Sequence, residues 1–131
     1  MDNIKLHIKE IQSYEDFQNE TKYTVNAKMG KKDKTVFIRY EHEGIKVNIK
    51  VKNEKIEISQ EENGISKNIL IFIENKPWQY RLYTEVGNID IKISTQKIEY
   101  SYEPLHLYLK YDVLMNEKKI STNEYHYNLD L

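Results

Sequence analysis

The sequence predicts an all-β protein, an antiparallel up-and-down meander of about ten strands that closes into a barrel. Apolar and polar residues alternate with period two along most of the 131 residues, as in strands with one buried face. The chain contains many isoleucines and 11 tyrosines, which favour strands. Short polar segments interrupt the alternation where hairpin turns are expected. A long sheet of this kind tends to curl and close, because closure removes its exposed edges. A ten-strand sandwich is the second choice.

The first strands follow directly from the alternation. Ile4, Leu6 and Ile8 alternate with charged residues and define the first strand. The period is lost over residues 12–20, the one place where a short helical turn is expected. A second strand then faces inward through Tyr23, Val25, Ala27 and Met29.

The third and fourth strands are expected on either side of a loop at residues 41–44. Folding the chain across this loop pairs Tyr40 with Ile45. The inward positions of the two strands are Val36, Ile38, Tyr40, Ile45, Val47, Ile49 and Val51.

The next two turns are predicted from their residues. A two-residue turn at residues 53–54 sets Val51 opposite Ile56. The dipeptide at residues 63–64 is Asn-Gly, which suits a type I′ hairpin because both residues tolerate positive φ. This second hairpin places Ile58 opposite Ile69.

The strand that follows is apolar on both faces. If Ile69 points inward, Leu70 and Phe72 lie on the outer face. An apolar outer face predicts cover, either by residues 12–20 or by another subunit. Leu70 and Phe72 are therefore a candidate partner face.

The second half of the chain continues the meander. A turn at residues 75–77 is expected to set Ile73 against Trp78, and a hairpin at Gly87-Asn88 to set Val86 against Ile89.

The inward positions change from odd to even after Thr95, which predicts one long strand bent by a β-bulge. A turn at residues 103–104 then pairs Tyr100 with Leu107. An odd-numbered loop in the last hairpin opposes Tyr111 to Tyr125 and keeps charge off the apolar face.

Several short segments resemble the YwiB-like family of small uncharacterised bacterial proteins. They are Tyr40-Glu41, Tyr83-Thr84-Glu85-Val86-Gly87, Thr95, Leu109-Lys-Tyr111 and Ser121-Thr-Asn123, in that order along nearly the whole chain. The resemblance implies a lipocalin-like (calycin-type) barrel and no particular activity. Many members carry Arg-x-Gly before the sixth strand, where this chain reads Gln60-Glu-Glu-Asn-Gly64. A site built on that arginine is therefore expected to be missing.

Composition limits the partners and the compartment. The formal net charge is −1, which gives no general attraction to nucleic acid or to anionic membranes. There is no cysteine, so disulfides and thiolate chemistry are excluded. The N-terminus has no apolar h-region, and no apolar run is long enough to span a bilayer. We expect one cytoplasmic domain over residues 1–131, from a bacterium with an AT-rich genome given the 18 lysines against two arginines.

No catalytic or metal-binding motif is found, and no cofactor is expected. His7, His42, His106 and His126 are expected on or between outward positions, without partners at metal-ligand spacing. The strand carboxylates alternate with lysines on the outer face, so the interior is expected to contain no charged side chain. Why Arg39 and Arg81 are arginines in a lysine-rich chain stays open.

Uncharged polar side chains are expected to line the interior. They form either a ligand site for a small neutral or amphipathic molecule or a filled, hydrogen-bonded core. In the first case the protein is a binding protein and not an enzyme. In the second it acts as an interaction protein through the Leu70/Phe72 face, as a monomer or homodimer. The candidate ligand-binding residues are Tyr40, Tyr80, Thr84, Thr95, Tyr100, Tyr102, Tyr111, Asn123 and Tyr125, with Ser121 beside them.

Overall fold

The computed structural model describes residues 2–129, apart from the side chains of residues 66–68 and 82. The described chain forms strands and turns, and none of it is a helix that could span a membrane. The ten strands are β1 (Asp2–Ser13), β2 (Gln18–Lys32), β3 (Thr35–His42), β4 (Ile45–Lys52), β5 (Lys55–Glu62), β6 (Ile65–Ile73), β7 (Pro77–Thr84), β8 (Gly87–Ser101), β9 (His106–Met115) and β10 (Lys118–Leu129).

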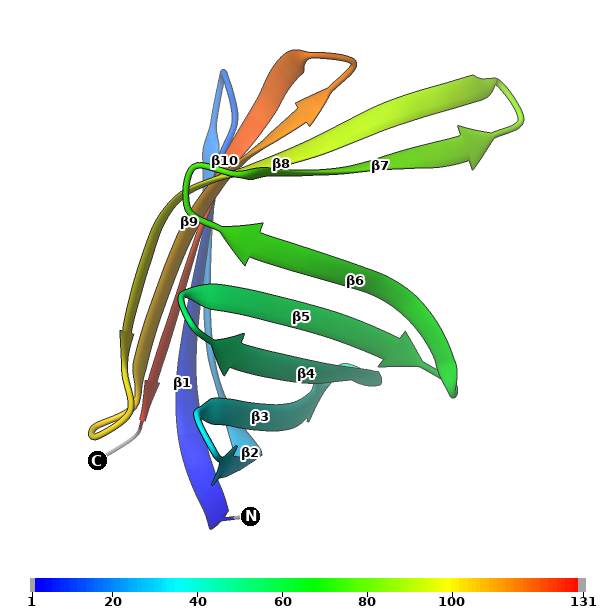
Figure 1. Cartoon of the computed structure of the whole chain (residues 1–131). Coiled ribbons are helices and arrows are strands. Elements are labelled where there is room, and N and C mark those ends of the chain that lie inside the picture. Colours follow the sequence, from blue (N-terminus) through cyan, green and yellow to red (C-terminus); the bar gives the residue numbers. More distant parts are fainter. Residues whose placement is uncertain (1, 130–131) are drawn as a thin grey trace.

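All ten strands belong to one antiparallel sheet that curls into a nearly closed barrel (Figure 1). The sheet order is β6-β5-β4-β3-β2-β1-β10-β9-β8-β7, so the first and last strands of the chain pair with each other. Ile8, for example, lies opposite Tyr127. The predicted all-β, ten-strand antiparallel barrel is confirmed.

The barrel is incomplete between β6 and β7. Among the described residues an isolated bridge pairs Ile73 with Lys76, just before β7, and the expected pairing of Ile73 with Trp78 is wrong. The connection instead bonds to β8. The Asn75 amide donates to the Thr95 carbonyl at 3.1 Å, and the Ile98 amide donates to a carboxylate oxygen of Glu74 at 2.6 Å. These bonds use backbone groups of β8 beyond Ser94, where its pairing with β7 ends.

That bend is the predicted β-bulge. The pairing of β8 with β9 shifts between Thr95 and Lys97, and Tyr100 lies opposite Leu107 as expected. Before the bulge the odd-numbered residues of β8 face inward, and after it the even-numbered residues do, because the bulge adds one residue. One long strand can therefore keep an apolar inner face along its whole length.

Two-residue turns with positive φ join many of the hairpins. The turn at residues 53–54 has φ values of 48° and 62° and sets Val51 opposite Ile56, as predicted. Two other hairpins are shifted from their expected positions. His42, and not Tyr40, pairs with Ile45. Thr84 pairs with Gly87, so the turn lies at residues 85–86 and leaves Val86 95% exposed.

In the last hairpin the same side chains face inward as predicted, but a two-residue turn and a bulge replace the expected odd-numbered loop. Its turn has two residues, Asn116 and Glu117, and the register shifts between Lys119 and Ser121. Tyr111 therefore lies opposite Asn123, and not opposite Tyr125 as predicted. A bulge of one residue preserves parity just as an odd loop would.

The expected helical turn at residues 12–20 is wrong. β1 continues to Ser13, β2 begins at Gln18, and the Tyr14 amide donates to the Phe17 carbonyl at 2.8 Å across the loop between them. The rings of Tyr14 and Phe17 stack with their centroids 4.7 Å apart. This segment therefore extends the β1–β2 hairpin.

The faces of β6 are opposite to the prediction. A register shift at Gln60 places Ile58 opposite Leu70 and not opposite Ile69. Phe72 is 1% exposed and packs on Tyr111 with ring centroids 4.8 Å apart, whereas Ile69 is 50% exposed. The candidate partner face of Leu70 and Phe72 is therefore part of the interior, because the irregular residues 66–68 reverse the strand's parity.

Candidate functional site

An interior cavity of about 360 Å³ opens at the end of the barrel that carries the β3–β4 turn. Its walls come from inward positions on eight strands and from the β3–β4 turn. They are Glu10, Thr21, Tyr23, Tyr40, His42, Glu43, Ile45, Val47, Ile58, Gln60, Leu70, Phe72, Tyr111, Tyr125 and Tyr127. The volume lies at the lower end of small-molecule pockets, roughly 300–1,000 Å³.

The carboxylate of Glu10 lies in this cavity, so the prediction of an interior without charged side chains is wrong. Glu10 occupies the inward parity of β1, after Leu6 and Ile8, and accepts a hydrogen bond from the Tyr23 hydroxyl at 2.9 Å. Both side chains are half-buried. Burial first, and then the neighbouring Tyr40 and Glu10, raise the pKa of Tyr23. Tyr23 therefore stays a neutral hydrogen-bond donor at neutral pH.

His42 also faces the cavity and is not an outward histidine as expected. It follows Val36, Ile38 and Tyr40 on the inward parity of β3. Its ring stacks on that of Tyr23 with the centroids 3.9 Å apart and the planes inclined by 9°. The stack holds both rings at the opening.

Buried phenols form the deeper wall. Burial raises the pKa of Tyr40 to about 12, although hydrogen bonds with Tyr127 and Tyr23 act in the opposite direction. The pKa values of Tyr111 and Tyr127 are also raised, in the first place by burial. The Tyr125 ring lies 6.0 Å from both Tyr111 and Tyr127 in near-parallel orientation. The cavity therefore combines aromatic faces with hydroxyl groups.

The structure brings together three of the nine predicted ligand-binding residues. Tyr40, Tyr111 and Tyr125 line the cavity. Asn123 is buried and donates to the Ser121 hydroxyl at 3.0 Å, as in a filled core. Thr95 is buried, and no described group bonds to its hydroxyl.

The other four predicted residues do not line the cavity. Tyr80 and Tyr100 are exposed, and Tyr102 is half-buried with the Lys31 ammonium 5.0 Å from its ring centroid. The Thr84 hydroxyl donates to the Gly87 carbonyl at 2.6 Å within the turn. Tyr102 packs against the core without lining the cavity. The other three lie in a turn or at exposed positions, since β7 is the edge strand at the open side of the barrel.

Three of the lining residues that the sequence analysis missed could have been predicted from the alternation. Glu10, His42 and Tyr127 each lie one step beyond an inward run already recognised on its strand. Their inward positions were not predicted because they are polar or lie at the end of a strand, and alternation is normally followed only as far as the apolar residues extend.

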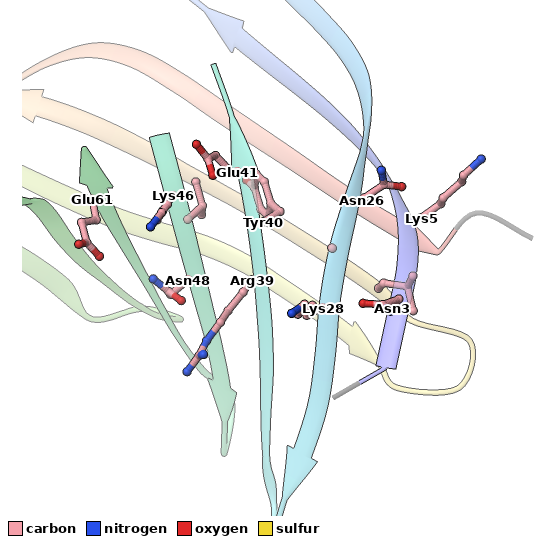
Figure 2. A pocket seen from close by; sticks show the side chains of 13 residues that line it. Asn3, Lys5, Asn26, Lys28, Arg39, Tyr40, Glu41, Lys46, Asn48 and Glu61 are labelled. Atoms are coloured by element: carbon pink, nitrogen blue, oxygen red, sulfur yellow. The ribbon is translucent and has the colours of Figure 1, made fainter. Parts of the chain in front are cut away.

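A second hollow of about 840 Å³, the outer groove, lies on the opposite face of β1 to β5 (Figure 2). Two rows of outward side chains line it, together with four residues of the inward parity, Ile4, Ala27, Tyr40 and Val47. One row contains Asn3, Lys28, Arg39 and Asn48, and the other contains Lys5, Asn26, Glu41, Lys46 and Glu61.

The two arginines have different surroundings. Arg39 stands in the outer groove among lysines and asparagines (Figure 2). Arg81 Nε lies 2.8 Å from a carboxylate oxygen of Asp90 on the neighbouring strand β8, at the surface. As far as residues 2–129 are described, no three His, Cys, Asp or Glu side chains gather to hold a metal ion.

A family model described as a domain of unknown function (DUF1934) matches residues 6–127. The chain belongs to this family. The DUF1934 chain is also similar to a solved structure, the ywiB protein from Bacillus subtilis, with a TM-score of 0.71 and 17% sequence identity. The similarity covers 98% of this chain and 92% of that one. At this identity it shows a shared fold, which confirms the YwiB-like resemblance. No curated protein matches the chain.

Proposed function

We propose that this barrel binds a small amphipathic molecule in its interior cavity and works as a binding protein without catalysing a reaction. The observation that carries the proposal is the cavity of about 360 Å³ with aromatic walls and a few polar groups at its opening. Binding sites for small molecules have this composition, since apolar walls supply burial and a few polar groups fix orientation.

The chemistry at the opening favours binding over catalysis. The Tyr23 hydroxyl is bonded to Glu10, and burial raises the pKa of Tyr23, so this phenol is not an activated nucleophile. The alternative of an outer apolar face at Leu70 and Phe72 is not retained, because both line the cavity.

Blocking the cavity tests the proposal. Leu70→Trp adds a large side chain to the lining, while Ile69→Trp adds the same side chain to the outer face of the same strand. Native mass spectrometry of the purified protein and an NMR screen of amphipathic fragments would measure binding. We expect fragments to bind the wild type and Ile69→Trp and to lose at least about tenfold in affinity for Leu70→Trp. Equal affinity for both variants, or no fragment binding to the wild type, would refute the proposal.

A further inference from the structure

The charged groups of the interior cavity are mainly acidic. Its described lining contains the carboxylates of Glu10 and Glu43 and no lysine or arginine. His42 Nε2 lies 3.8 Å from a carboxylate oxygen of Glu43 and is the one described group of the lining that could become cationic. The cavity therefore has a negative charge and lacks a permanent cation of its own among the described residues.

Glu10 is placed to meet a ligand. It receives the Tyr23 hydrogen bond on one carboxylate oxygen, and no described lysine or arginine forms an ion pair with it. A carboxylate has lone pairs for about four hydrogen bonds. Lys9, its neighbour in sequence, pairs with Glu20 at 3.2 Å and does not line the cavity.

The aromatic walls of the cavity also favour a positively charged ligand. The rings of Phe72, Tyr111 and Tyr125 form a continuous cluster, with centroid separations of 4.8 Å and 6.0 Å between neighbours. The face of an aromatic ring attracts cations, and more strongly where water is partly excluded. Aromatic walls beside one carboxylate are the chemistry that recognises an ammonium group attached to an apolar body.

We propose that the molecule bound in the interior cavity is an organic amine, an inference that rests on the proposed function. Its ammonium group donates to Glu10, and its apolar part packs on Phe72, Tyr111 and Tyr125. An anionic ligand of the same shape is rejected, because its charge would be brought next to Glu10 and Glu43 without a compensating cation. This replaces the neutral ligand that a charge-free interior would favour.

Three probes with one ring and different terminal charge test the inference. Tyramine, tyrosol and 4-hydroxyphenylacetate carry an ammonium, a hydroxyl and a carboxylate group at the end of related short chains. Calorimetry or NMR titration of the wild type near neutral pH would rank them. We expect tyramine to bind about tenfold more tightly than tyrosol, and tyrosol more tightly than the carboxylate, since a hydrogen bond between two charged groups is stronger than one to a neutral group.

Two matched variants locate the effect. Glu10→Gln keeps the shape and an acceptor for Tyr23 but removes the charge. It should bind tyramine with a clearly smaller preference over tyrosol than the wild type, since Glu43 and the aromatic walls remain. Glu41→Gln removes a carboxylate from the outer groove on the other side of the wall and should leave the tyramine preference unchanged (Figure 2).

The outcomes separate this inference from the proposed function. Equal binding of all three probes, or tighter binding of tyrosol or the carboxylate, would leave a binding cavity and overturn the amine. No binding of any probe to the wild type would overturn the amine, and the fragment screen would then decide the proposed function. An undiminished preference for tyramine in Glu10→Gln would also overturn the assignment. If Glu10→Gln fails to fold, the order of the three probes on the wild type still decides.

Discussion

Replacing Phe72 by alanine tests which face of β6 is inside. The Phe72 side chain is 1% exposed, and its ring packs on Tyr111 and faces the cavity. Truncation removes a large buried side chain and leaves a space that the surrounding strands fill only in part. Substitutions of this kind cost about 3–5 kcal/mol. We expect Phe72→Ala to lower the free energy of unfolding by about that amount.

Two controls isolate the effect of the face. Ile69→Ala truncates a side chain that is 50% exposed on the outer face of the same strand. We expect Ile69→Ala to lower the free energy of unfolding by about 1 kcal/mol, from the loss of a half-buried side chain and of strand propensity. Phe17→Ala removes the same residue type at a position that is 57% exposed, and should cost about 1 kcal/mol or less.

Equilibrium unfolding in urea, followed by tyrosine and tryptophan fluorescence, measures all three variants. A change in midpoint at constant slope reports stability alone. If Phe72→Ala leaves too little folded protein, Phe72→Leu should give a smaller loss in the same direction, since it removes less buried volume. A loss for Ile69→Ala equal to or larger than that for Phe72→Ala would refute the bulged register, because without the bulge Ile69 would be the buried residue.

Three further predictions concern Thr95, Tyr40 and Glu74. Thr95→Val should leave stability unchanged or raise it by about 1 kcal/mol in the urea assay, because the buried hydroxyl has no described partner; a loss above about 1 kcal/mol would count against this. The folded pKa of Tyr40 is raised, so the stability linked to its proton is fully present below about pH 10 and is lost as the pH rises through about 12. The contribution of Tyr40 to this loss is about 3 kcal/mol. Unfolding measured across that range should therefore show a loss about 3 kcal/mol larger in the wild type than in Tyr40→Phe, because Tyr23, Tyr111 and Tyr127, whose pKa values are also raised, contribute in both proteins. Glu74→Ala should speed hydrogen exchange of the Ile98 amide and cost about 1 kcal/mol, whereas Glu74→Gln, which keeps an acceptor, should change both less.

The strands and several of the turns, which depend on residues close together in the sequence, were predictable from the sequence. Alternation identified the strands, since side chains on a strand point to opposite faces in turn. The turn at residues 53–54 and the bulge after Thr95 also followed from local residue types and parity. Where the turn position was misplaced, as at residues 85–86, the inward parity of the flanking strands was still right.

The candidate site was predicted only in part. Tyr40, Tyr111 and Tyr125 were recognised because they continue inward runs within their strands. Glu10 and His42 also continue inward runs, but they were not recognised because the alternation was followed only as far as the apolar residues extend. Their inward placement depends on how strands distant in sequence meet at the barrel opening, where Tyr23 contacts both side chains.

The sequence by itself determined an antiparallel ten-strand meander, because period-two patterning and turn residues act between neighbours along the chain. The tertiary structure decided the face of β6, the incomplete pairing between β6 and β7 and the acidic character of the cavity. In β6 the residues from Ile69 to Ile73 are all apolar, so alternation gives no preference between the two faces. Packing of Phe72 against Tyr111, on a strand far away in sequence, makes that choice.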